Sequence, residues 1–435
     1  MARKSLILCA LALLIVSSSA SEHDRHERHD RGDEEGDHHK QATSPFVLKE
    51  PVQVVSTEAG DIQVLPGPKE LGALAENHIG LSIITIEPKG LLLPQYLDAS
   101  CVLYVHKGRM TLGWAEQDYL NRQDLETGDI YALPGGFVFY VLNTDEGQRL
   151  RLYGMCDTSE SLDAGHFQSF FVGGGVDPRT ILSGFRKEAV AAALKVAPED
   201  VSEILGSQTE GPIVYTSRAG YDFLKGDSAA SNARGDAPKP FNLLKKAPDF
   251  KNENGWTIAV HGAEFSPLKE ADVGVFAVSL KPGAMLAPHW NPRAAEVAFI
   301  TKGNGRIQVS YPNGTNALDK ELDESKVVFV PRYFPMCQIA SRNGDFEFVG
   351  FSTSSRRNRP QFLAGLIVFH VVLGLKRSFL SFAGSNSVFK AFSKDIMSKT
   401  FNVDAKRLEA VLDNQRDAVI LPGFIEEDGK RSSAM

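Results

Sequence analysis

The chain has 435 residues, of which 43% are hydrophobic and 23% charged, so it is long enough to bury a sizeable core and predicts two domains. Its net charge of −7 weighs against nucleic acid as a main partner. The 38 glycines and 22 prolines, with few long helical patterns, predict short strands joined by turns.

Residues 1–20 have the three parts of a secretory signal. Arg3 and Lys4 give a basic start, Leu6–Val16 is an apolar run, and small residues lead up to Ala20. The alternative, a membrane anchor, is weaker because this run is too short to span a bilayer. We therefore predict the secretory pathway, cleavage after Ala20 and no membrane partner.

Residues 21–43 form a charged tail. Five of the eleven histidines lie between Ser21 and Lys40, alternating with acids and arginines and without apolar residues, which predicts disorder. Such a tract could bind transition metals loosely, although a plain solvated tail is the simpler interpretation. A second flexible tail is expected at 423–435.

Cysteine usage leaves one thiol over. Cys9 departs with the signal, and Cys101, Cys156 and Cys337 remain. In an oxidising compartment these allow at most one intrachain pair. The residues do not decide which pair forms.

An internal repeat organises the rest of the chain. In each half an apolar strand leads into a Pro-Lys-Gly or Lys-Pro-Gly turn, a proline-initiated strand, a Lys-Gly turn and further strands. The first copy spans Leu81–Trp114 and Leu125–Met155, and the second spans Val273–Tyr311 and Ser325–Phe351. Turns at strand spacing with apolar alternation predict a sandwich or barrel in each half.

Each β half is followed by helical sequence, at Gly184–Gln208 and Ala391–Leu421. We predict an N-terminal domain at 44–225, a linker at 226–240 and a C-terminal domain at 241–422. Asp404 is a candidate N-cap. Apolar spacing in the helices predicts stripes that face a partner subunit, formed by Ala189, Ala192, Ala193, Val196, Leu408, Val411 and Leu412.

Several separated motifs carry a family resemblance. The spacing of Gly283, His289, Asn291, Glu296 and Gly303, followed by Pro331 and Cys337, resembles the paired motifs of the cupin superfamily. Together with the repeat, the stretches FFVGGG (170–175), FNLLKKAPDFKNENGW (241–256) and RNRPQFLAG (357–365) resemble the vicilin-type (7S) seed storage globulins over Phe46–Pro422. The resemblance implies a mainly β bicupin: two jelly-roll β-barrel domains, each followed by a short helical segment. It also implies a homotrimer and storage in vacuolar protein bodies of the seed.

The resemblance also raises a metal question. Cupins that hold a metal use two histidines and a glutamate from the first motif and a histidine from the second. Here His289 and Glu296 match, Asn291 replaces the second histidine, and Cys337 replaces the last. An imidazole with a thiolate favours copper or zinc. We consider a vestigial site at His289 and Cys337, with Asn291 and Glu296 as neighbours, against an ordinary buried polar pair.

The N-terminal half lacks such a ligand set. Gln95 stands at the first histidine position, Leu97 at the second, Val102 at the glutamate and Tyr140 at the last histidine. We expect that barrel to be a packed core.

One segment breaks the repeat. Residues 366–384, LIVFHVVLGLKRSFLSFAG, lie between two Ala-Gly pairs, and deleting them restores the match with the first half. His370, Lys376 and Arg377 interrupt its apolar run and argue against a membrane helix. We interpret the segment as an in-frame intron read as coding sequence.

Three functions remain as hypotheses. Non-enzymatic nutrient storage requires no cofactor and is expected in the protein storage vacuole or outside the cell. A small-ligand-binding globulin, similar to sucrose-binding ones, would use a barrel cavity. A metal-dependent oxidoreductase is disfavoured by Asn291 and Cys337. The sequon Asn313–Thr315, in an expected hairpin turn, predicts N-glycosylation.

Overall fold

A computed structural model describes residues 46–48, 50–65, 78–116, 119–163, 165–225, 239–363, 389, 392–414 and 419–422. The predicted signal with its cleavage site at Ala20, both tails, most of the linker and the anomalous segment 366–384 lie outside the described residues.

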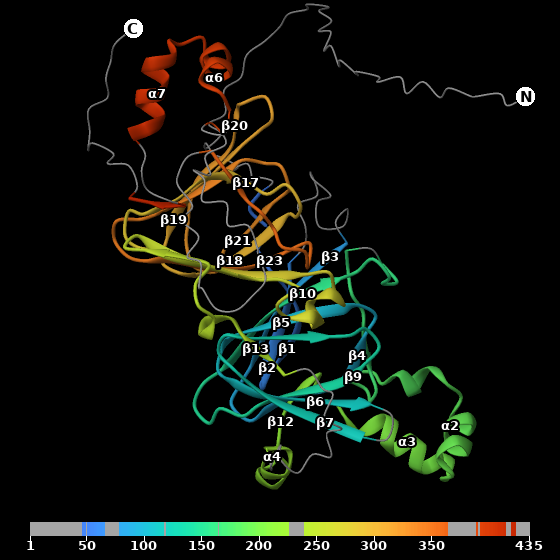
Figure 1. Cartoon of the computed structure of the whole chain (residues 1–435). Helices are drawn as coiled ribbons and strands as arrows, with labels where there is room; N and C mark the ends of the chain where they lie inside the picture. Colours follow the sequence, from blue (N-terminus) through green and yellow to red (C-terminus); the bar gives the residue numbers. More distant parts are fainter. Residues whose placement is uncertain are drawn as a thin grey trace, which may run out of the picture. The chain divides into compact units, whose positions relative to one another are not determined.

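The N-terminal half contains two antiparallel sheets (Figure 1). The first has the strand order β1-β2-β3-β10-β5-β8-β13, and the second has the order β11-β4-β9-β6-β7, with β12 also pairing β4. The strands of the first sheet are β1 (Val52–Thr57), β2 (Gly60–Val64), β3 (Ile79–Ile86), β5 (Ser100–Lys107), β8 (Asp129–Leu133), β10 (Leu150–Asp157) and β13 (Phe241–Asn242). Those of the second are β4 (Gly90–Leu97), β6 (Arg109–Glu116), β7 (Tyr119–Glu126), β9 (Val138–Asn143), β11 (Ser169–Phe171) and β12 (Ile213–Tyr215).

The C-terminal half repeats this arrangement, with the orders β14-β15-β16-β23-β18-β21 and β20-β19-β22-β17-β24, where β25 also pairs β17. The first of these sheets contains β14 (Phe250–Asn252), β15 (Gly255–Val260), β16 (Gly274–Leu280), β18 (Glu296–Lys302), β21 (Val327–Val330) and β23 (Phe346–Ser352). The second contains β17 (Met285–Trp290), β19 (Gly305–Ser310), β20 (Asn316–Leu322), β22 (Met336–Ala340), β24 (Gln361–Phe362) and β25 (Ile420–Leu421). The predicted mainly β fold with two barrels is confirmed.

A shared apolar core joins the two barrels. Side chains alternate between the two faces of a strand, so on β5 Leu103 and Val105 fill the N-terminal barrel while Val102 and Tyr104 face the other way. The latter two belong to one buried cluster with side chains of β16, β18 and β23. At its centre the ring of Tyr153 stacks on that of Phe299, with centroids 4.4 Å apart.

The two halves also exchange short segments. The bridge between Val47 and Val328 pairs the start of the described chain with the C-terminal barrel, and Phe46 is buried in that barrel's core. Conversely, β13 pairs with β8 of the N-terminal barrel. Residues 46–48 and 241–242 thus follow the sheet that offers them hydrogen-bond partners, not the half of the sequence in which they lie.

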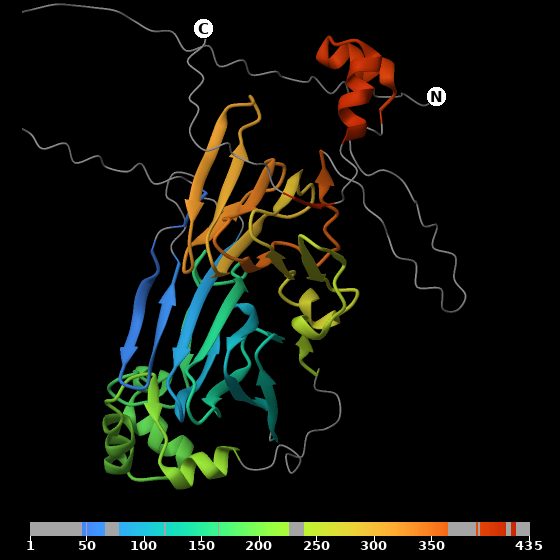
Figure 2. The same ribbon diagram turned by 90° about the vertical axis from the view of Figure 1, so that its left-hand side faces the viewer.

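Helices follow each barrel, and Figure 2 shows those of the N-terminal half gathered at one end of their barrel. The α-helices are α2 (Lys187–Leu194), α3 (Pro198–Ser207), α4 (Arg218–Lys225), α6 (Lys394–Phe401) and α7 (Ala405–Asn414), and the 3₁₀ turns are η1 (Ile181–Gly184), η3 (Leu243–Lys245) and η4 (Ser266–Lys269). Asp404 caps α7 as predicted, because its Oδ1 accepts hydrogen bonds from the backbone of Lys406 and Arg407. No helix of the described residues is long and apolar enough to cross a membrane.

Candidate functional site

The C-terminal barrel contains a cavity of about 300 Å³ that is open to solvent on one side, where exposed residues line it. Its polar lining includes His289 on β17, Glu296 at the start of β18, Gln338 on β22 and Asn358 in the segment after β23. Aromatic and aliphatic side chains supply much of the remaining wall, among them Phe276, Val278, Leu286, Phe348 and Phe362. The cavity thus combines an apolar wall with a few polar groups.

His289 is held neutral in this wall. Burial lowers its pKa to about 4, and its Nδ1 lies 2.8 Å from the carbonyl oxygen of Ala287. Because a carbonyl can only accept a hydrogen bond, Nδ1 carries the proton and Nε2 is left as an acceptor. The ring packs against Phe362, with centroids 5.0 Å apart.

Glu296 has two neutral amides as hydrogen-bond partners. Burial raises the pKa of its carboxyl to about 7, against the opposing effect of donors from Asn291 and Asn358. The Nδ2 of Asn358 lies 3.3 Å from the glutamate Oε1. Above pH 7 the ionised carboxylate therefore relies on these amides rather than on a cation.

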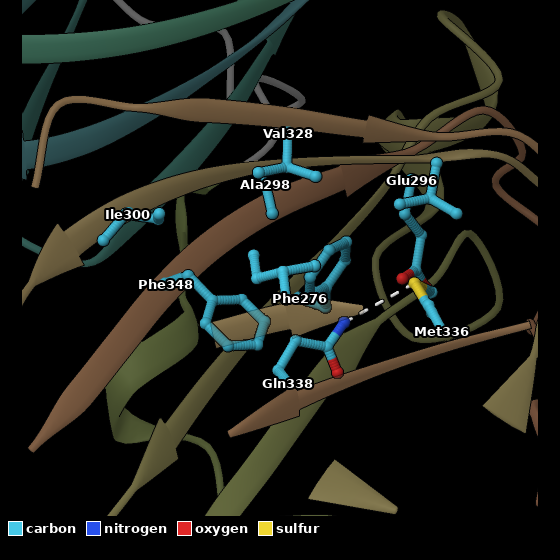
Figure 3. A pocket seen from close by; sticks show the side chains of 10 residues that line it. Phe276, Glu296, Ala298, Ile300, Val328, Met336, Gln338 and Phe348 are labelled. Carbon is cyan, nitrogen blue, oxygen red and sulfur yellow. Dashed lines mark hydrogen bonds between the residues drawn. The ribbon is translucent and has the colours of Figure 1, made fainter. Parts of the chain in front are cut away.

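Gln338 lies beside Glu296 at a narrow void of about 20 Å³ next to the main cavity (Figure 3). Its Nε2 is 3.5 Å from the sulfur of Met336, a weak acceptor. Its Oε1 is buried and has no hydrogen-bond partner among the described residues. No sequence motif singles out Gln338.

Cys337 does not face His289, so the predicted pair is not brought together. His289 pairs across the sheet with Met336, and directly paired residues share a face. Cys337 is the next residue on β22 and hence points to the opposite face, where its sulfur lies 3.4 Å from Oε1 of Gln308. Burial raises the pKa of this thiol to about 11, which disfavours the thiolate that metals require.

The first barrel needs a similar correction by one residue. Cys101 on β5 pairs with Cys156 on β10 as Glu296 on β18 pairs with Ser352 on β23. The counterpart of the glutamate is therefore Cys101 rather than Val102. Cys101 and Cys156 form a disulfide, and Cys337 is the free cysteine of the described residues.

The other predicted positions of the first barrel have three different surroundings. Gln95 is buried, with an Oε1 that lacks a partner among the described residues. Tyr140 packs outside the barrel core, against Tyr221 of α4. Leu97 is only partly buried and contacts the cluster around the disulfide.

The residues present do not fit a cupin metal. His289 and Glu296 line the same cavity, but Cys337 lies on the other face of its strand and the Asn291 amide donates to Glu296. Within the described ranges no group of three or more His, Cys, Asp and Glu side chains could hold a metal ion. We derive no chemistry that passes through a metal.

The chain is similar to known proteins in sequence and in fold. The model of the family described as Cupin matches residues 46–202 and 241–381. Vicilin-like seed storage protein At2g28490 of Arabidopsis thaliana is 33% identical over 431 residues, which cover 87% of this chain and 80% of that protein. The chain belongs to the vicilin-type seed storage globulins of the cupin family.

Other vicilins are similar to this chain in sequence or in fold. Vicilin Cor a 11.0101 of Corylus avellana is 26% identical over 404 residues, covering 90% of this chain and 86% of that protein. A crystal structure of hazelnut vicilin superposes with a TM-score of 0.76 at 26% identity, over 88% of this chain and all of that one. A vicilin of Solanum melongena, 22% identical with a TM-score of 0.78 over 89% of this chain and 100% of its own, revealed different anionic ligands in structurally similar pockets.

Asn313 lies in the exposed turn between β19 and β20 of this vicilin-type chain, where its Oδ1 accepts hydrogen bonds from the backbone and hydroxyl of Thr315. We expect seed-derived protein to carry an N-linked glycan there, because the sequon is exposed and the sequence predicts entry into the secretory pathway. Mass spectrometry before and after glycosidase treatment measures it. The expected mass loss should vanish in Thr315→Ala, and finding only unmodified Asn313 in seed protein would contradict the prediction.

Proposed function

We propose that this storage globulin is non-enzymatic, enters the secretory pathway, is deposited in the protein storage vacuole and assembles as a homotrimer through its helices. The observation that supports assembly is the apolar surface of both helical pairs. Inside the first pair, Val190 and Ala191 pack on Val201. Large apolar side chains nevertheless remain exposed on or beside the helices: Phe185, Leu194, Val196, Ile204, Phe392, Ile396, Phe401 and Val411.

The predicted stripes largely coincide with this exposed surface. Ala189, Ala192, Ala193 and Val196 are exposed, as expected for side chains that await a partner. Leu408 is an exception, because it is buried, and with Leu412 it lines a groove between α6 and α7. A second and third copy of the chain would cover the exposed side chains on a closed ring.

Charged substitutions on these helices should dissociate the trimer. Ile204→Glu combined with Val411→Glu would bury unpaired carboxylates in a subunit contact, which is strongly unfavourable. Light scattering at micromolar concentration should show a trimer for the parent and monomers for the double variant. Leu162→Glu is the control, since Leu162 is 78% exposed and lies in a loop rather than in a helix. A monomeric parent, or a double variant that remains trimeric, would contradict the proposal.

Non-enzymatic storage is supported by the chemistry of the barrel site. His289 is neutral and buried, the Cys337 thiol faces away from the cavity, and Glu296 is held by amides. No two of these groups form a pair of nucleophile and general base, which nucleophilic catalysis requires.

A second candidate function, compatible with storage, is binding of a small molecule in the C-terminal cavity. Its size and apolar wall with few polar groups are typical of ligand sites. The vicilin of Solanum melongena provides a precedent for ligands in pockets of this fold. Binding to the native state raises the thermal midpoint. The function would be contradicted if no small cation, anion or neutral polyol raised the thermal midpoint.

A further inference from the structure

The cavity of the C-terminal barrel contains an acid, Glu296, that has no cationic partner among the described residues. The carboxyl of Glu296 accepts hydrogen bonds from the Asn291 and Asn358 side chains, and both are uncharged. A buried carboxylate is stabilised most strongly by a cation that also donates hydrogen bonds.

The polar groups around Glu296 add acceptors rather than cations. His289 leaves Nε2 as an acceptor, because its Nδ1 donates to the Ala287 carbonyl. The buried oxygens Gln338 Oε1 and Asn358 Oδ1 lack hydrogen-bond partners among the described residues. A ligand placed here therefore meets several acceptors, which selects for a group with several N–H or O–H donors.

Charged side chains occur farther out along the cavity wall. Arg356 and Arg357 line it and are exposed to solvent. Asp249 and Glu264 also line it, and both contact Lys246. None of these charges is a partner of Glu296.

We infer that the C-terminal cavity binds a small organic ammonium ion, whose N–H groups donate to Glu296 and His289 and whose apolar body lies on the aromatic wall. The inference rests on the proposal that this cavity takes a small ligand. Phe276, Phe348 and Phe362 line the cavity and supply apolar area, and aromatic rings attract cations. The ammonium supplies a positive charge and three N–H donors next to Glu296, whose hydrogen-bond partners in the described part of the chain are two neutral amides.

Other ligand classes fit this part of the cavity less well. An anion would approach the Glu296 carboxylate and meet lone pairs on His289. At His289 and Glu296 a transition metal would find one imidazole and one carboxylate, and no third His, Cys, Asp or Glu of the described residues is placed to complete a site with them. The arginines at 356 and 357 are the groups that would favour an anion, so the experiment must compare charge types directly.

Three ligands that share one ring make this comparison on the unmodified protein: benzylamine, benzyl alcohol and benzoate. At about pH 8, above the Glu296 pKa of about 7, with a chelator present, we expect calorimetry to show benzylamine binding at least about tenfold more tightly than benzyl alcohol, and no binding of benzoate. Glu296→Gln should reduce benzylamine affinity about tenfold and leave benzyl alcohol unchanged. Glu270→Gln, at an exposed acid outside the cavity, should match the parent.

Three other outcomes would overturn the inference, each in favour of a different conclusion. Tighter binding of benzoate than of benzylamine would overturn the ammonium inference while supporting a ligand cavity. Binding of zinc or manganese without chelator, together with no benzylamine binding, would overturn it in favour of a metal. If no ligand binds, both the inference and the ligand-binding function fail, and storage is unaffected. Because the three-ligand comparison needs no substitution, it decides even if Glu296→Gln does not fold.

Discussion

Replacing Phe299 by alanine is expected to destabilise both barrels together, by about 3 to 5 kcal/mol. Phe299 is 2% exposed, stacks on Tyr153 of the other barrel and meets Phe351 edge to face. Its removal leaves a cavity in a core to which both halves contribute. The loss should therefore appear in the unfolding of the N-terminal barrel, although the substitution lies in the C-terminal one.

Tryptophan fluorescence can separate the two barrels in a denaturant titration. Trp114 lies in the N-terminal barrel, and Trp256 and Trp290 lie in the C-terminal one. Variants that keep one or the other set should both show a lower midpoint with Phe299→Ala. Phe223→Ala, at a ring that is 73% exposed, should change neither. A shift confined to the C-terminal reporters would mean that the barrels unfold independently.

Removing the disulfide should have a comparable effect. Cys101 and Cys156 are 55 residues apart, and the chain-entropy model gives about 4 kcal/mol for closing a loop of that length. The double variant Cys101→Ala, Cys156→Ala should lose about this much stability, measured by denaturant unfolding without reductant. Because the barrels share a core, the tryptophan reporters of both barrels should show this loss, although the bond joins two strands of the N-terminal barrel.

The reductant provides the matched control. Dithiothreitol should lower the midpoint of the parent and leave the double variant unchanged, because Cys337 is then the only cysteine left among the described residues. A double variant as stable as the oxidised parent would show that the bond contributes nothing beyond the packing of β5 against β10.

The fold could be predicted from the sequence because the same pattern of strands and turns occurs twice. Both halves have the same turns at the same spacing, and one-sided apolar alternation identifies strands well. Strand phase could not be predicted where both faces are buried. In β5, Leu103 faces one core and Val102 another, so apolarity does not tell which residue points inward. The misplacement of Val102 has this cause.

The site was predicted in part for the same reason. His289 and Glu296 do line one cavity, as the spacing indicated. On β22 the pattern Met336-Cys337-Gln338 does not reveal a face, because all three side chains are buried. Pairing with β17 decides the matter and turns Met336 and Gln338 inward. Asn358 reaches Glu296 across 62 residues, a contact that no local pattern encodes.

The segments exchanged between the barrels determine whether either half of the chain can be produced alone. Phe46 fills the core of the C-terminal barrel, and Leu243, next to β13, is buried in the shared core. A fragment that stops at the linker would lack an edge strand and expose a sheet face meant for its missing half, which favours aggregation. Either half produced separately should be insoluble, whereas a protease cut within the linker should leave two pieces that co-purify.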